Sequence, residues 1–233
     1  MTYPKILTLL LLGEGAAVSI ERIVEALWDD DPPATARRQV RNRVASLRRV
    51  LKGHGFDPVQ TVAQGYRIAS GDVQCDCCDF NRLAERARMH AAAERFDAAV
   101  QSMDDALAVW SGPALMGLTG KVFEASSHRL EESRFGAIES RAAWQLRLGR
   151  SDVIIGELSE LVAAKPDRQR LLYLYMSALQ SSGRAAEALK AYEIHRLRLS
   201  EELGIEPGQA LQRLHVSILR DEQPFADSRY PSP

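Results

Sequence analysis

The residues best suited to chemistry are the arginines of one short basic stretch. Between Ala34 and Phe56 the chain carries seven Lys or Arg and no Asp or Glu. Like charges at helical spacing cost roughly a few tenths of a kcal/mol per pair, so a solvated helix normally mixes both signs. The alternative interpretation is an ordinary cationic surface helix. We interpret the stretch as a binding site for a polyanion, which would relieve the repulsion.

A helix over residues 34–52 would place apolar and cationic side chains on opposite faces. The apolar residues recur at spacings of three and four and therefore share one side: Ala36, Val40, Val44, Leu47 and Leu51. A step of about 100° per residue places another set on the opposite side: Arg38, Arg41, Asn42, Arg49 and Lys52. Arg37, Arg43 and Arg48 lie on the flanks. Since the apolar side must be buried, the cationic side is predicted to face a ligand.

Three cysteines form a second cluster, Cys75, Cys77 and Cys78. They are too close together for a disulfide framework, which favours a reducing, cytoplasmic compartment. A C-x-C-C cluster can bind a soft metal, but a closed tetrahedral site needs about one more thiolate or imidazole ligand. The nearest histidines, His54 and His90, do not lie at a spacing from the cysteines that would supply it. We therefore predict buried or idle thiols and no metal, and the role of the cluster stays open.

Motifs of catalysis are missing from the sequence. It contains no GxxxxGK[ST] or GxGxxG loop, no GxSxG elbow and no HExxH zinc motif. His128, His195 and His215 lie in stretches rich in Arg and Glu, which favours exposed surface histidines over ligands. We predict that the protein is not an enzyme and uses no cofactor.

The charge is distributed unevenly along a chain whose net charge is −1. Residues 1–70 carry 10 basic and 7 acidic side chains, whereas residues 71–233 carry 20 and 24. Any nucleic-acid function therefore belongs to the first third of the chain. The apolar run from Ile6 to Leu12 superficially resembles a signal-peptide core, but it is too short to span a bilayer and is equally a buried helix. No membrane association is predicted.

Two helices are predicted ahead of the basic one. The first covers residues 4–12 and ends at Gly13 and Gly15. Ser19 is the expected N-cap of the second, whose apolar residues follow the full amphipathic spacing: Ile20, Ile23, Val24, Leu27 and Trp28. The acidic, proline-containing residues 29–33 then break the chain. This order is typical of a helix-turn-helix unit, whose last helix enters the major groove.

Residues 58–69 predict a β-hairpin directly after the basic helix. Two β-prone runs, VQTV and YRIA, flank a tight turn that contains a glycine, AQG. In this position the hairpin is a wing. Arg67 beside the turn is placed to reach a phosphate or the minor groove.

These segments together carry a family resemblance. This chain resembles the OmpR-type winged helix of the SARP family in the segment WDDDPPATARRQVRNRVASLRRVL followed by VQTVAQGYRI. Members of the SARP family are bacterial activators of antibiotic biosynthesis gene clusters. The resemblance implies that the basic helix reads directly repeated promoter half-sites. The candidate DNA contacts are Arg38, Arg41, Asn42, Arg43, Ser46, Arg49, Gln64 and Arg67. The resemblance also implies that the loop after the second helix contacts RNA polymerase, including its sigma factor, through Trp28, Asp29, Asp30 and Asp31.

One feature departs from that family. Its members usually carry a small antiparallel sheet ahead of the first helix, whereas this sequence begins at the helix itself. We expect the sheet either to lie upstream or to be absent. Its absence would leave apolar side chains of the helices uncovered.

From Phe80 onward the sequence is helical almost throughout and contains a repeat. Segments around Gly149 and Gly183 align on Gly-Arg, and their separation of 34 residues is the period of tetratricopeptide helix pairs. We expect the glycine to let paired helices approach closely, and Ala188 and Tyr192 to be packed in the second helix. The alternative is an ordinary helical bundle with chance self-similarity.

An earlier copy of the repeat, containing Ala99 and Met103, lies 55 residues upstream. The extra 21 residues indicate an insertion over residues 111–134. The bacterial transcriptional activation domain of SARP proteins is similar to ALAVWSGPAL, LEESR and AYEIHRLRLSEELGIEPGQALQRLHVSILR. In this last segment Gly204 and Pro207 are expected to end one helix and start the next.

The sequence therefore predicts a mainly α protein in two domains. Residues 1–72 form a winged helix-turn-helix with a small β-hairpin wing, residues 79–222 form an all-α tetratricopeptide-like domain, and residues 223–233 form a disordered tail. The predicted function is activation of a biosynthetic gene cluster by a DNA-bound homodimer or by tandem protomers that recruit RNA polymerase. The alternative is a tetratricopeptide-type interaction or ligand-sensing module without DNA binding.

Overall fold

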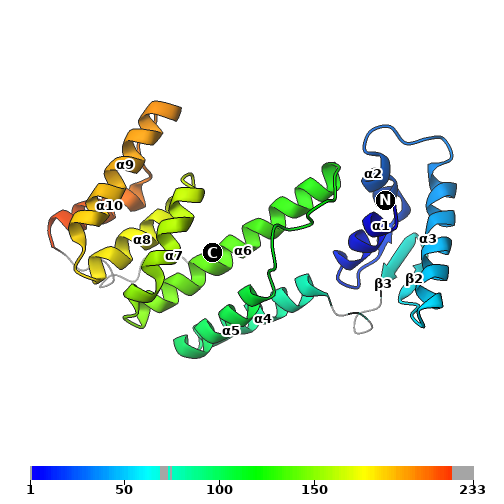
Figure 1. Ribbon diagram of the computed structural model, residues 1–233, viewed down its shortest axis with the longest axis horizontal. Coiled ribbons are helices and arrows are strands. Elements are labelled where there is room, and N and C mark those ends of the chain that lie inside the picture. The colour runs from blue at the N-terminus through cyan, green and yellow to red at the C-terminus, as the bar shows by residue number, and fades with distance from the viewer. Residues whose placement is uncertain (1, 69–72, 74, 222–233) are drawn as a thin grey trace. The chain divides into compact units, whose positions relative to one another are not determined.

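A computed structural model describes residues 2–68, 73 and 75–221 of the chain (Figure 1). The chain divides into two compact units. The first contains Met1–Glu85 and Asp105–Phe135, and the second contains Arg86–Asp104 and Gly136–Pro233. These units group the chain differently from the predicted domains, whose bounds at 72, 79 and 222 stay predictions. The predicted tail at 223–233 lies outside the described residues.

The first unit begins with the three predicted helices. These are α1 (Thr2–Leu11), α2 (Ile20–Trp28) and α3 (Ala36–Gly53). The N-cap prediction is confirmed, since the Ser19 hydroxyl accepts a hydrogen bond of 3.1 Å from the backbone N–H of Arg22. The apolar side of α3 is buried as predicted, with Val40, Val44 and Leu47 at most 3% exposed.

Three short strands accompany these helices: β1 (Val18–Ser19), β2 (Val59–Val62) and β3 (Gly65–Ile68). They form one antiparallel sheet in the order β1-β3-β2, and Val62 pairs with Gly65 across a two-residue turn. The hairpin is therefore confirmed, but Gly65 is the first residue of β3 and not a turn residue. A Cβ at Gly65 would lie 1.9 Å from the carbonyl oxygen of Val18. Glycine is needed at this position because the backbone of β1 passes too close to leave room for a side chain.

The core of the first unit combines segments far apart in sequence. Ile6 and Leu10 of α1, Ile23 of α2 and Val40 of α3 are fully buried. They share one cluster with Val122 and Phe123, which begin α6 (Lys121–Arg147). The predicted insertion over residues 111–134 therefore supplies part of the core that supports the winged helix. Leu115 and Leu118 of the preceding loop also pack against it.

A helical hairpin precedes α6, made of α4 (Asp76–Ala92) and α5 (Phe96–Ala108). Parts of α4, α5 and α6 enter the second unit, where Ala99 and Met103 are fully buried. Arg141 of α6 forms ion pairs with Asp104 of α5, at 2.8 Å, and with Glu157 of the next helix. One guanidinium thus joins three consecutive helices.

The rest of the second unit consists of α7 (Ser151–Ala164), α8 (Gln169–Ser181), α9 (Ala185–Leu203) and α10 (Gln209–Leu219). Ala188 and Tyr192 are buried as predicted. Gly204 ends α9 in the left-handed conformation, and α10 begins two residues after Pro207. The mainly helical fold, with a small antiparallel sheet in its N-terminal part, is confirmed.

Two expectations about this unit are wrong in detail. A Cβ at Gly149 or Gly183 would meet no atom within 4 Å, so neither glycine serves a close approach of helices. Both have positive φ, of 69° and 74°, and end their helices in a turn that favours glycine. His195 is 7% exposed and not on the surface, because α9 turns it inward beside Tyr192 and Leu199. Burial lowers the pKa of its imidazole.

No helix in the described ranges is long and apolar enough to cross a membrane.

Candidate nucleic-acid interface

The outer face of α3 presents a stripe of uncompensated polar and cationic groups. Arg38, Arg41, Asn42 and Arg49 are exposed. In the part of the chain that the structure describes, no hydrogen bond or ion pair engages these four side chains. The small side chain of Ala45 is exposed between them. Because the opposite side of α3 is anchored in the core, this stripe points away from the protein and is free to meet a ligand.

The cations at the two ends of α3 are already paired. Arg37 lies 2.6 Å from Glu21 of α2, and Lys52 lies 2.9 Å from Asp57 after the helix. Both pairs are exposed, so each contributes little to stability. The unpaired positive charge of α3 therefore lies on Arg38, Arg41 and Arg49.

Arg48 has a structural role that the sequence did not indicate. Its Nε donates to the carbonyl oxygen of Val59 at 2.9 Å, and its Nη2 donates to the hydroxyl of Thr61 at 2.9 Å. Its guanidinium carbon lies 5.7 Å from the ring centroid of Tyr66. Arg48 thus ties β2 and β3 to α3 and fixes the wing beside the basic helix. Its position on the helix flank, just before a β-hairpin, is the only sequence signal for this role.

Arg43 is also held by the protein. Its Nη1 donates to Thr2 at 3.0 Å and its Nη2 donates to Gln39 at 3.2 Å. The guanidinium carbon lies 4.9 Å from the ring centroid of Trp28. These contacts join α3 to α1 and α2, so Arg43 is less available to DNA than the central arginines are. Ser46 is half-buried, and its DNA contact stays a prediction.

The wing carries the two remaining candidates. Gln64 is exposed in the turn, and Arg67 is exposed on β3. The Nε of Arg67 donates at 3.0 Å to the side-chain oxygen of Gln60, its partner residue on β2. This bond holds Arg67 against the outer side of the hairpin.

The acidic loop between α2 and α3 is engaged with a distant segment of the same unit. An Oδ1 atom of Asp29 accepts a hydrogen bond of 2.9 Å from the backbone N–H of Lys121, the first residue of α6. Asp30 forms an ion pair with the Lys121 side chain and raises the pKa of its ammonium group. Asp31 is exposed and Trp28 lies under Arg43. The negative charge thus sits at a helix N-terminus, where the helix dipole favours it.

A shallow hollow of about 380 Å³ lies beside this loop. Its lining contains three acidic residues, two prolines and the cationic Arg37, which is paired with Glu21: Glu21, Glu25, Asp29, Pro32, Pro33 and Arg37.

Two known protein families match the chain, each over a separate range of residues. Residues 3–68 match the family described as transcriptional regulatory protein, C terminal. Residues 75–219 match the bacterial transcriptional activator domain.

Several curated regulators are similar to the chain over almost its whole length. EmbR of Mycobacterium tuberculosis is 34% identical over 93% of this chain and 57% of EmbR. DnrI of Streptomyces peucetius is 34% identical over 93% of this chain and 83% of DnrI. AfsR of Streptomyces griseus is 36% identical, but the match covers 22% of AfsR. The chain thus spans little more than half the length of EmbR.

A solved structure of a relative has a similar fold. M. tuberculosis EmbR, in complex with a low-affinity phosphopeptide, superposes with a TM-score of 0.88 and 31% sequence identity. The superposition covers 95% of this chain and 59% of the EmbR chain.

Proposed function

Because this chain belongs to the SARP-type family of DNA-binding transcriptional regulators, which join a winged helix to a bacterial transcriptional activator domain, we propose that it activates a biosynthetic gene cluster. In this proposal α3 lies in the major groove of directly repeated promoter half-sites, and the wing contacts the adjacent backbone. A homodimer or tandem protomers occupy the repeats and recruit RNA polymerase.

The observation that supports this proposal best is the unpaired stripe on α3. Arg38, Arg41 and Arg49 carry positive charge that no acidic group of the described chain neutralises. A polyanion such as the DNA backbone would supply the missing negative charge. Arginine can also donate two hydrogen bonds to guanine, and Asn42 can pair in the same way with adenine. The stripe therefore suits both affinity and sequence readout.

The proposed polymerase contact rests on the acidic loop. Asp31 is exposed, and its side chain enters no hydrogen bond or ion pair in the described chain. Asp29 and Asp30 are occupied by Lys121, and Trp28 packs against the core under Arg43, so we propose that Asp31 makes the first contact. Transcription by purified RNA polymerase, from a promoter that carries binding sites selected from random duplexes, tests this assignment. Asp31→Ala should lower transcript yield while DNA affinity stays unchanged, and an unchanged yield would refute the assignment.

A salt titration of the full chain tests DNA binding itself. Binding sites are first selected from random duplexes, and affinity is then measured at several salt concentrations. Changing Arg38, Arg41 and Arg49 together to alanine should reduce the slope of log affinity against log salt. The expected reduction is about 0.9 for each DNA phosphate that these arginines neutralise.

The matched control removes three arginines of the second unit, the exposed Arg184 and Arg198 and the half-buried Arg196, and so changes the net charge equally. It should keep the original slope. Failure to select any duplex, or equal slopes for both triple variants, would favour the alternative interaction module without DNA binding.

A further inference from the structure

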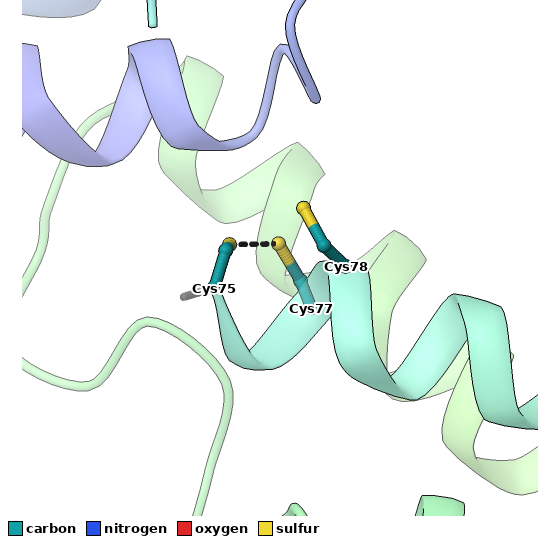
Figure 2. A group of neighbouring side chains, drawn as sticks. All are labelled: Cys75, Cys77 and Cys78. Atoms are coloured by element: carbon teal, nitrogen blue, oxygen red, sulfur yellow. Dashed lines mark hydrogen bonds between the residues drawn. The ribbon is translucent and has the colours of Figure 1, made fainter. Parts of the chain in front are cut away.

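Three thiols converge where α4 begins, apart from the α3 stripe and the wing. Cys75 is buried and directly precedes the helix, and Cys77 and Cys78 are half-buried in its first turn. All three sulfur atoms lie within 4.8 Å of one another. The Sγ atoms of Cys75 and Cys77 are 2.9 Å apart. Figure 2 shows the three sulfur atoms gathered at one edge of this first turn.

This spacing matches a set of sulfur ligands around one ion. Zinc–sulfur bonds of about 2.3 Å in a tetrahedral arrangement place the sulfur atoms about 3.8 Å from each other. The Cys75–Cys77 separation of 2.9 Å is shorter than that value, and no two sulfur atoms of the cluster are more than 4.8 Å apart. Three potential ligands are thus already collected by one short segment of backbone, and binding requires side-chain rotation that moves the sulfur atoms of Cys75 and Cys77 apart.

The electrostatics of the cluster favour a cation over three free thiolates. A bound metal ion supplies the positive charge that makes deprotonation of several adjacent thiols favourable. The partial positive charge at the N-terminus of α4 also stabilises the deprotonated, negatively charged form of these thiols.

Asp76 holds the cluster in place. Its Oδ1 accepts a hydrogen bond of 2.8 Å from the backbone N–H of Cys77 and a weak one of 4.0 Å from the Cys75 thiol. The side chain between the first two cysteines therefore fixes the backbone that presents their sulfur atoms. Outer contacts of this kind commonly orient metal ligands.

We propose that Cys75, Cys77 and Cys78 bind one soft metal ion, Zn²⁺ or Cu(I), through three thiolates. Thiolate sulfur selects these ions over hard cations such as Mg²⁺. As each sulfur–metal bond forms, the thiol releases its proton to solvent, so no electron is transferred. Three thiolates satisfy Cu(I), and a water molecule completes the tetrahedron of Zn²⁺. The sequence pattern alone lacked a fourth protein ligand, and the proposed site does not need one.

Spectroscopic titration of the full chain tests the site. The protein is reduced, freed of metal with a chelator and kept without oxygen. Cd²⁺ then serves as a probe, because it gives thiolate charge-transfer absorption, and Zn²⁺ and Cu(I) are titrated in parallel against chromophoric chelators. We expect one ion per chain. Each of Cys75→Ser, Cys77→Ser and Cys78→Ser should remove about a third of the absorption and weaken binding at least tenfold.

Met89→Ser is the matched control, because it removes an exposed sulfur atom from the same helix and should change neither quantity. Alkylation with mass spectrometry gives a second measurement that does not depend on variants: bound Cd²⁺ should protect all three thiols of the unmodified chain. Absence of stoichiometric binding, or binding that survives all three serine variants, would overturn the proposal. So would formation of a Cys75–Cys77 disulfide under mild oxidant in a chain that binds no metal.

Discussion

At the level of single residues, the arginines of α3 show how position decides the role of one side-chain type. Arg41 projects from the middle of the outer face and has no partner in the described chain. Arg48, on the flank nearest the hairpin, is hydrogen-bonded to β2, and Arg43, on the other flank, lies over Trp28. The difference follows from the angle of each residue relative to the buried side of the helix. Arg43 and Arg48 on the flanks reach neighbouring elements, whereas Arg38, Arg41 and Arg49 opposite the core do not.

Changing Arg41 to alanine should weaken binding to the selected duplex and relax its sequence preference. The expected loss is about 1 to 3 kcal/mol if the guanidinium contacts a guanine. Fluorescence anisotropy with the selected duplex and its single-base variants measures both effects. Arg37→Ala is the control, because Arg37 is paired with Glu21 at the end of the helix and should have a smaller effect. An unchanged affinity and preference would remove Arg41 from the interface.

Gly65 is the residue whose replacement should disturb the wing most. A Cβ added there would lie 1.9 Å from the carbonyl oxygen of Val18, so Gly65→Ala must separate β1 from β3. We expect a loss of about 1 to 3 kcal/mol in the free energy of unfolding, measured by denaturant titration. Gly53→Ala provides a contrast, since a Cβ on this residue of α3 meets nothing within 4 Å and its φ is not positive. Equal effects of the two changes would contradict the close approach.

At the level of elements, three helical hairpins of the second unit share one turn. Glu94, Gly149 and Gly183 follow α4, α6 and α8 with φ of 56°, 69° and 74°. The next residue is an arginine each time, and its backbone N–H bonds the carbonyl oxygen five residues earlier at 3.0, 2.9 and 2.8 Å. This bond is typical of the Schellman motif. The repeat predicted from the sequence is therefore also a repeat of backbone geometry, and its first copy carries glutamate in place of glycine.

Glu94→Gly should consequently stabilise the protein. Glycine adopts positive φ without the steric cost that glutamate bears, and the exposed side chain of Glu94 makes no hydrogen bond in the described chain. The expected gain is about 0.5 to 1 kcal/mol in the free energy of unfolding, from denaturant titration. Gly149→Ala should shift it in the opposite direction by a similar amount. A loss of stability in Glu94→Gly would show that the left-handed turn does not strain this site.

At the level of the whole molecule, the winged helix does not complete its core alone. Val122 and Phe123 of α6 join the cluster formed by α1, α2 and α3, and Asp29 accepts a hydrogen bond from the start of α6. The segment that interrupts the helical repeat therefore belongs to the same compact unit as the basic helix. We infer that the stability of the DNA-binding part depends on residues far downstream of it in the chain.

Phe123→Ala tests that dependence. Phe123 is fully buried, so its truncation should cost about 3 to 5 kcal/mol. Hydrogen exchange should show faster amide exchange in α1 and α2, although neither helix is altered in sequence. Glu124→Ala, an exposed neighbour on α6, should stay within about 0.5 kcal/mol of the unchanged protein. If amide exchange became faster only in α6, the helices α1 and α2 would be stable independently of α6.

Local patterns in the amino-acid sequence were enough to predict the helices, the hairpin and the outward direction of Arg38, Arg41 and Arg49. These features depend on residues close together in the chain, where helical and strand geometry fix the angle between neighbours. The same patterns located the repeat at Gly149 and Gly183, although the reason inferred for those glycines was wrong.

Contacts between distant groups could be seen only in the folded chain. Folding brings Val18 against Gly65, Asp29 to Lys121, Phe123 into the core of α1–α3, and Arg48 onto the hairpin. Local propensity holds no information on these contacts, because they depend on how complementary surfaces pack after the elements have formed. Burial of His195 follows for the same reason: a polar helix surface becomes interior only when another helix covers it.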